Sequence, residues 1–245
     1  APFSVEYGMF RGSTINVVTK SGTNEFTGSA YYYKGKDDWA GDRSRGQDLS
    51  FTFDEETKGG TFGGPIMKDR LFFFLSYENL DRTAPQNFGP TGSGAAVEIP
   101  GVTQAEYDQI VAITNTVYGF NPGERFDALK EQDEKMLGKL DWNISDSQRA
   151  SLSYQHTEGN EIITANNDTA LHFLSTPSNW YNRAIKMDSA SLQLFSDWND
   201  FFSTEFKLAR KEVEVRQDSL NGTDFAEMQV ITPSGGRVFV GPDEF

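Results

Sequence analysis

The sequence predicts an all-β fold, namely an antiparallel portion of a transmembrane β-barrel with about seven meander strands. Several segments alternate apolar and polar residues with the period of two that gives a strand one apolar and one wet face. The links between these segments alternate between short and long. Aromatic residues make up 13% of the 245-residue chain, which is too many for a disordered polypeptide.

The alternating segments predict seven strands, at residues 24–34, 51–65, 70–81, 134–145, 148–160, 188–198 and 201–216. In the first strand Phe26 and Tyr32 share one face, opposite Tyr31 and Tyr33. The third strand begins with the run 71–75, which is apolar on both faces. We therefore expect one face of that strand to rest on something buried inside the barrel.

The clearest hairpin covers the fourth and fifth strands. The fourth strand places on one face Met136, Gly138, Leu140, Trp142 and Ile144. After the polar turn 145–147, the fifth strand presents Ala150, Leu152, Tyr154 and His156. Lys139 and Arg149 fall on the opposite face. The sixth and seventh strands repeat this pattern around the turn 197–200.

The lengths of the connections distinguish between β architectures. The links after the second, fourth and sixth strands have only a few residues, whereas those after the first, third and fifth are long: residues 35–50, 82–133 and 161–187. This alternation is typical of a membrane barrel, in which tight periplasmic turns face long extracellular loops. A soluble sandwich has no physical reason to sort its loops in this way.

The second long loop contains one predicted helix. Thr103 and Glu106 have the spacing of a capping box, apolar residues recur at helical spacing up to Tyr118, and Gly119 supplies a stop. We expect this helix to pack its apolar face onto the barrel rim. Covering a ligand is the alternative role.

Composition limits the classes of partner. No apolar run approaches the roughly 20 residues that a spanning helix needs, but barrel strands need only about 10 residues with one apolar face. The net charge of −14 disfavours nucleic acid. It either reflects simple solubility or marks acidic loops that attract cations. The absence of cysteine excludes disulfides and thiolate sites.

The sequence contains no pattern that predicts catalysis. His156 and His172 have no carboxylate spacing beside them that suggests a metal site, and no motif places a serine next to a base. The glycine-rich stretch 59–64 lacks the Lys-Ser/Thr ending of a phosphate loop, so we expect its glycines to let the strand bend or let another backbone approach. The pair Asp37-Asp38, the acidic stretch 54–56 and the Asn-Asn-Asp stretch 166–168 are better explained as solvated charge than as calcium ligands. We therefore expect no enzyme activity, no catalytic residues, no metal and no cofactor.

Two sets of surface residues are candidates for function. Trp142, Trp198 and Phe202 lie at the short-turn ends of their strands and are candidates for a membrane-interface girdle, although ordinary β-propensity also explains each of them. Strand parity places Tyr31, Tyr33, Lys139 and Arg149 on the lumen side. Pairing between strands explains these four equally well, and no other ligand residue is predicted.

Four stretches resemble a known family: residues 15–31, 62–74, 137–146 and, weakly, 190–216. They are similar to TonB-dependent outer-membrane receptors, and most similar to the Oar-like branch. The resemblance implies that residues 1–22 end a plug domain and residues 23–245 begin a barrel of about 22 strands. The chain has no initiating methionine and ends in Gly241-Pro242-Asp243-Glu244-Phe245, so we expect a segment of a longer protein.

The resemblance also implies a location and partners. The protein would lie in the bacterial outer membrane and take up a siderophore, cobalamin, glycan or peptide. Its partners would be outer-membrane lipid and lipopolysaccharide, TonB through the missing N-terminal part, and the remaining strands of its own barrel.

A secreted, soluble β-sandwich binding module or adhesin is the second hypothesis. It rests on the mean hydropathy of −0.55, the acidic charge and the lack of cysteine. A sandwich would bury Leu140, Trp142, Leu152 and Tyr154 against a second sheet, whereas a barrel would turn them towards lipid.

Overall fold

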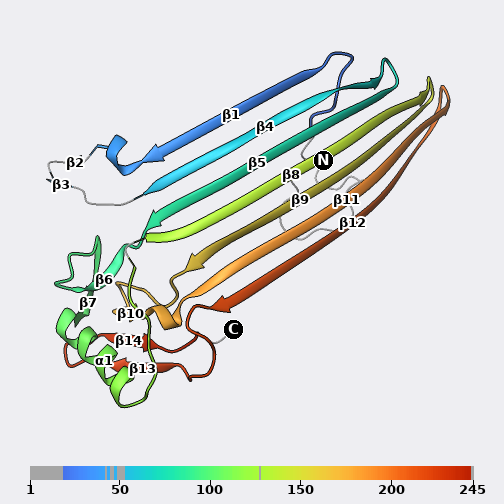
Figure 1. The fold of residues 1–245 in the computed structure, drawn as a ribbon. Coiled ribbons are helices and arrows are strands. Elements are labelled where there is room, and N and C mark those ends of the chain that lie inside the picture. The colour runs from blue at the N-terminus through green and yellow to red at the C-terminus, as the bar shows by residue number, and fades with distance from the viewer. Residues whose placement is uncertain (1–18, 42, 45–46, 49–52, 127, 244–245) are drawn as a thin grey trace.

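A seven-stranded antiparallel sheet forms most of the structure, a computed structural model that describes residues 19–41, 43–44, 47–48, 53–126 and 128–243. The strands follow one another in chain order: β1 (Thr27–Lys36), β4 (Asp54–Met67), β5 (Leu71–Pro85), β8 (Ala128–Ser145), β9 (Gln148–Ile163), β11 (Tyr181–Asn199) and β12 (Phe202–Ser219). The sheet is long and curved, with β1 and β12 as its edges (Figure 1). All seven predicted strands are confirmed, and all except β4 extend further towards the long loops than the sequence indicated.

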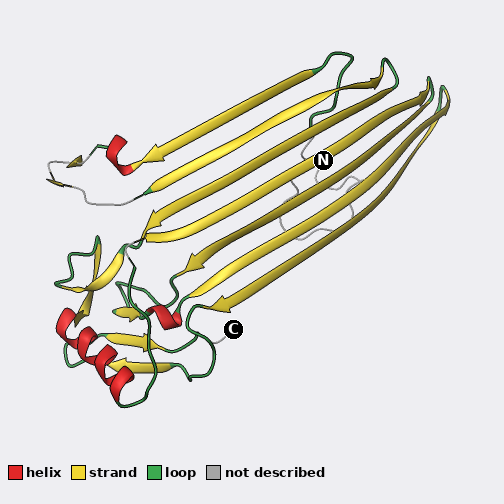
Figure 2. Cartoon of the chain, viewed as in Figure 1, coloured by secondary structure: helices red, strands yellow, loops and turns green. Residues whose placement is uncertain are grey.

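The short and long connections lie at opposite ends of the sheet (Figure 2). The hairpin turns 68–70, 146–147 and 200–201 are at one end, and the connections 37–53, 86–127 and 164–180 are at the other. The predicted parity of the loops is therefore confirmed. In the first turn Asp69 has a φ of 63°, the left-handed conformation that closes a tight hairpin.

The register aligns the apolar positions of neighbouring strands. One row pairs across five strands: Phe73, Leu140, Leu152, Leu192 and Leu208. A second row, nearer the turns, contains Leu71, Trp142, Ala150, Leu194 and Phe206. A slip of one residue in any pair would send half of these side chains to the other face, so the alignment fixes the register.

Aromatic rings lie over the glycines of β4. A Cβ on Gly64 would come within 2.3 Å of the Phe26 ring, and one on Gly59 within 2.5 Å of the Tyr31 hydroxyl. A Cβ on Gly60 would meet the backbone oxygen of Ser29 at 2.7 Å, so a neighbouring backbone does approach this strand closely. The glycines of β4 therefore make room for packing from β1, as cross-strand aromatic–glycine pairs do in other sheets.

The second and third long loops and the segment after β12 fold together into a small unit with its own core, which we call the cap. It contains β6 (Phe88–Thr91), β7 (Val97–Thr103), α1 (Gln104–Thr116), β10 (Phe173–Ser175), η2 (Pro177–Asn179), β13 (Met228–Ile231) and β14 (Arg237–Val240). Its core consists of Ile99, Val102, Tyr107, Leu174, Val238 and Val240. Among the described residues, every buried apolar side chain except Phe74 lies in this cap. The first long loop contains η1 (Asp37–Trp39) and the two-residue strands β2 (Arg43–Ser44) and β3 (Gln47–Asp48).

The predicted helix is present with its capping box, but its packing differs from expectation. The Thr103 hydroxyl accepts a hydrogen bond from the Glu106 backbone N–H, and the Glu106 carboxylate accepts one from the Thr103 N–H. Gly119 has the expected left-handed φ of 66°. The helix α1 packs against β7 and β6 rather than the barrel rim, with Ile110 and Val111 against the cap core. In the described part of the chain, no helix is long and apolar enough to cross a membrane.

Polar contacts tie the cap to the start of β11. The Trp180 ring is fully buried, and its Nε1 donates to the Ser175 hydroxyl at 2.7 Å. Asn179, also fully buried, donates to the backbone oxygen of Gly241 at 3.0 Å. The bond from Asn179 joins the loop before β11 to the segment after β12, and the bond from Trp180 fixes that loop internally.

Leu174→Ala should loosen the cap without unfolding the sheet. The side chain is fully buried in the cap core, and truncating a buried leucine costs about 2–5 kcal/mol. Deuterium exchange should rise in residues 97–116 and 237–240 and stay constant in the hairpin 134–160. Leu171→Ala is the matched control because Leu171 is 60% exposed in the same loop. Equal effects of the two variants would contradict a shared cap core.

The start of α1 should depend on pH through Glu106. Hydrogen bonds, first of all from the Thr103 N–H, lower the pKa of Glu106 from its ordinary 4.5 to about 2. The ionised carboxylate therefore stabilises the cap fully above pH 4.5, and this contribution is lost as the pH falls through 2. Glu106→Gln should increase deuterium exchange in α1 at pH 7, and the difference from wild type should shrink towards pH 2. Glu124→Gln, an exposed residue of the same loop, should change little at either pH.

Candidate functional site

One face of the sheet carries a continuous apolar band near the hairpin turns. We call this the outer face and the opposite one the inner face. The band contains Phe26, Phe62, Phe73, Leu75, Leu140, Leu152, Leu192 and Leu208 with their neighbours towards the turns. Phe62, Leu152 and Leu208 are 50%, 49% and 61% exposed. Soluble monomers rarely expose an apolar surface of this extent to water. It therefore requires either a protein partner or lipid to cover it.

Three tyrosines mark the edge of the band towards the long loops. Their rings lie on the outer face, and each hydroxyl donates to a carboxylate: Tyr32 to Glu56 at 3.1 Å, Tyr77 to Glu134 at 3.0 Å and Tyr154 to Asp188 at 2.6 Å. The next row of the outer face is charged or polar on the six strands from β4 to β12, with Lys58, Asn79, Glu134, Glu158, Lys186 and Glu214. Apolar rings with polar tips at such a boundary are typical of a membrane interface.

The predicted girdle residues lie at the other edge of the band. Trp142, Trp198 and Phe202 are on the outer face near the hairpin turns, and they are 48%, 59% and 53% exposed. The Trp198 Nε1 donates to the Thr204 hydroxyl at 2.9 Å. Their role at a membrane interface stays a prediction, and it accords with the tyrosines on the opposite edge.

The four candidate lumen residues all lie on the inner face, but most of them are occupied by neighbours. Tyr31 donates to Glu78 at 2.8 Å. The Arg149 guanidinium lies 5.4 Å from the Phe195 ring centroid. Tyr33 is 65% exposed. Contact of these residues with a ligand remains a prediction, and pairing between strands explains Tyr31 and Arg149.

Lys139 contacts the segment that precedes β1. Its Nζ donates to the Ser21 hydroxyl at 2.7 Å and lies 3.3 Å from the Asp141 carboxylate. Its side chain is only 14% exposed. Ser21 therefore places the polypeptide ahead of the first strand against the inner face of the sheet.

Residues 21–24, which we call the linker, are held at two further points. A Cβ on Gly22 would lie 2.3 Å from the backbone oxygen of Phe73 and 2.9 Å from that of Gly64. Asn24 donates to the Asp69 carboxylate at 2.6 Å and accepts from the Asp69 backbone N–H at 2.7 Å. The linker is thus fixed to the first hairpin turn. These contacts are not predicted by the sequence pattern, in which the only signal is a glycine and an asparagine just before a strand.

The acidic stretches have structural partners. Asp54 and Glu56 lie 3.2 and 3.5 Å from the Lys34 Nζ, which is on the adjacent strand. Asp168 accepts hydrogen bonds from the backbone N–H groups of residues 170 and 171 and so closes a turn. No group of three or more potential metal ligands occurs among the described residues.

Comparisons with known proteins agree with this geometry. A family model described as an outer membrane beta barrel domain matches residues 18–97. The TonB-dependent transporter Oar of Myxococcus xanthus is 35% identical over 79 residues, a stretch that covers 29% of this chain and 7% of that protein. No solved structure matches.

The fold, the exposed band and the family match together define the class: a β-barrel protein of the bacterial outer membrane. The more particular likeness is to a transporter, and it points away from an enzyme. The chain spans a small part of the length of the relative that it matches, since 7% of that protein is aligned.

Gly22→Ala should displace the linker from the sheet. The added methyl group would meet two backbone oxygens that cannot rotate away, and overpacking of this kind costs about 1–3 kcal/mol. We expect faster deuterium exchange in residues 19–26 and 68–70. Gly41→Ala, where the added methyl meets nothing within 4 Å, is the matched control. Unchanged exchange in Gly22→Ala would refute the close contact.

Proposed function

We propose that this chain forms the end of a plug domain, residues 1–22, and the first part of the barrel, residues 23–245, of a TonB-dependent receptor. The observation that carries the proposal is the path of the linker: the polypeptide reaches β1 from the inner face, where Lys139 and Asn24 hold it. A plug inside a barrel would leave along such a path. Residues 1–18 lie outside the described part of the chain.

The receptor would take up a scarce nutrient, such as a siderophore, cobalamin, a glycan or a peptide. The similarity to a protein named TonB-dependent transporter Oar supports uptake. The receptor would belong to the Oar-like branch. The cap lies at the long-loop end of the sheet, which is the extracellular end of a membrane barrel. A ligand that arrives from outside the cell would contact the cap first. It would then contact the inner face of the sheet, where Tyr33 is exposed.

The remaining partners follow from the edges of the sheet. In the described part of the chain, β1 and β12 each have a neighbouring strand on one side only, and an unpaired edge is too costly in hydrocarbon to persist. Further strands of the same protein would complete the barrel. TonB would engage a segment that precedes this chain, and lipid and lipopolysaccharide would cover the apolar band.

The decisive experiment recovers the native protein from source membranes and compares unboiled and boiled samples by SDS–PAGE with mass spectrometry. We expect an outer-membrane band of mass far above 27.4 kDa that shifts on heating and contains these peptides. Growth on the transported nutrient should then require both this protein and TonB. A water-soluble band near 27 kDa without a heat shift would instead favour the secreted β-sandwich. A heat-shifting protein whose uptake survives deletion of TonB would be a barrel of another type.

A further inference from the structure

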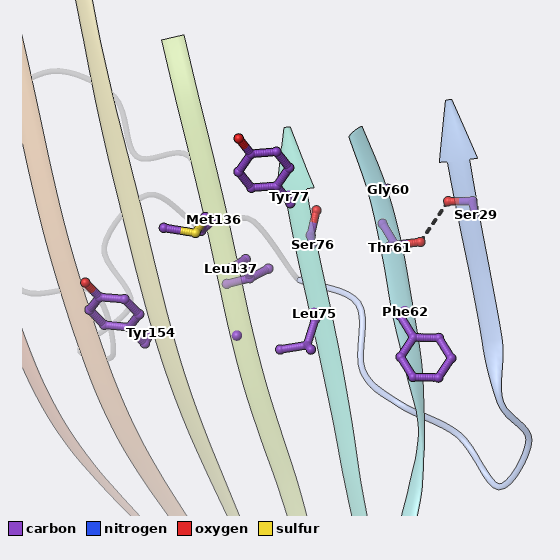
Figure 3. Close-up of a pocket in the computed structure, with 11 residues that line it drawn as sticks. Ser29, Gly60, Thr61, Phe62, Leu75, Ser76, Tyr77, Met136, Leu137 and Tyr154 are labelled. Carbon is purple, nitrogen blue, oxygen red and sulfur yellow. Dashed lines mark hydrogen bonds between the residues drawn. The ribbon is translucent and has the colours of Figure 1, made fainter. Parts of the chain in front are cut away.

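The apolar and polar faces of β11 and β12 change places along the strands. Up to the tyrosines the outer face of the sheet is apolar, and Leu75, Met136 and Tyr154 lie on it (Figure 3). Beyond the tyrosines the outer face of β11 and β12 carries charged residues such as Lys186 and Glu214. The inner face of the same stretch is apolar, and we call its four residues the aliphatic patch: Ile185, Met187, Val213 and Val215.

Strand propensity does not explain this inversion. Branched aliphatic residues favour β-strands, but that preference does not select one face of a sheet. The pairing of β11 with β9 and β12 is continuous from Tyr181 to Ser196, so no bulge turns the strands over. Nearer the turns, the inner positions of the same two strands are polar or small: Ser189, Ser191, Ala209 and Lys211. The apolar inner positions are therefore confined to one short stretch.

The described part of the chain leaves the aliphatic patch open. Ile185, Val213 and Val215 are 39%, 51% and 56% exposed. The linker contacts the inner face at Lys139, and Asp133, in the same row as Ile185, lies roughly 20 Å from it towards the long loops. The cap begins beyond the ends of the strands (Figure 1). The patch thus lies on the inner wall between the cap and the linker, where a ligand that has passed the cap would arrive.

The charged groups beside the aliphatic patch have a negative balance. The two inner rows that contain the patch and the next row towards the loops include five carboxylates: Glu55, Glu78, Glu131, Asp133 and Glu161. Three cations lie in these rows, and each is paired: Arg82 with Glu131, Lys135 with Asp133 and Arg183 with Glu161. Among the described residues of these rows, an anionic ligand would therefore find its cations already paired, whereas an ammonium group would meet an excess of carboxylate.

We propose that the aliphatic patch binds an aliphatic side chain of a transported peptide, whose ammonium group faces the neighbouring carboxylates. The proposal rests on the uptake function proposed above and narrows its substrate to the peptide. Contact with the patch removes apolar area from water on both partners. A sugar would instead bring hydroxyl groups against valine and isoleucine, which offer no hydrogen bond in return for the lost water.

Cysteine labelling tests the proposal, because this chain has no cysteine of its own. The full-length protein, with any cysteine elsewhere replaced, carries Val213→Cys on the patch or, as the matched control, Glu214→Cys on the outer face. Isolated outer membranes are treated with a membrane-impermeant maleimide, alone or with one of three probes. The probes are a pool of tripeptides with leucine, isoleucine or valine in the centre, the same pool with serine there, and malto-oligosaccharides.

We expect Val213→Cys to react readily in the absence of a probe. The aliphatic pool should slow that reaction about tenfold near saturation, and the other two probes should leave it unchanged. Glu214→Cys should react equally in every sample, and both variants should keep the heat shift of a folded barrel.

Four results would overturn the proposal. Val213→Cys that does not react without a probe would show that the plug or a loop of a further strand covers the patch. Protection by malto-oligosaccharides, equal protection by the serine pool, or no protection by the aliphatic pool would show that the patch does not select an aliphatic peptide. The labelling requires no TonB, so it is separate from the test of the receptor. Protection together with uptake that survives deletion of TonB would contradict the receptor and leave this site in place.

Discussion

The structure depends on one constraint, the in-register antiparallel pairing of seven long strands. Pairing satisfies the backbone groups along each strand, which is obligatory where no water is available. The same register aligns rows of apolar side chains such as Phe73, Leu140 and Leu152 on a single face. Pairing and partition into lipid therefore support the same arrangement, and neither tolerates a slip of one residue.

Burial is distributed in an unusual way for a chain of this composition. The sheet exposes many of its apolar side chains. The hydrophobic core of buried side chains lies in the cap, around Leu174 and Val238. Lipid replaces a protein core for the strands, whereas the extracellular loops meet water and must bury their own apolar residues. The low mean hydropathy follows from this division, because the inner face and the outer face beyond the tyrosines carry mostly polar and charged residues.

Most of the candidate ligand residues on the inner face contact other parts of the chain. Tyr31 covers Gly59, Lys139 holds Ser21, and Arg149 lies over Phe195. Residues that look like a binding surface by strand parity are thus engaged by neighbouring strands or by the linker. The strand pattern could identify the face on which they lie, but the contacts of each side chain depend on the strand beside it.

The sequence by itself determined the seven strands, the parity of the loops, the two faces and the capping box of α1. These features rest on periodicity and on pairs of residues only a few positions apart, such as Thr103 and Glu106. Only the tertiary structure decided the cap, the partner of α1 and the attachment of the linker. Asn24 and Asp69 are 45 residues apart, Ser21 and Lys139 are 118 apart, and Gly101 and Thr232, which join in the cap, are 131 apart. Local patterns carry no signal for such contacts, because the side chains meet only after the sheet has brought the loops together.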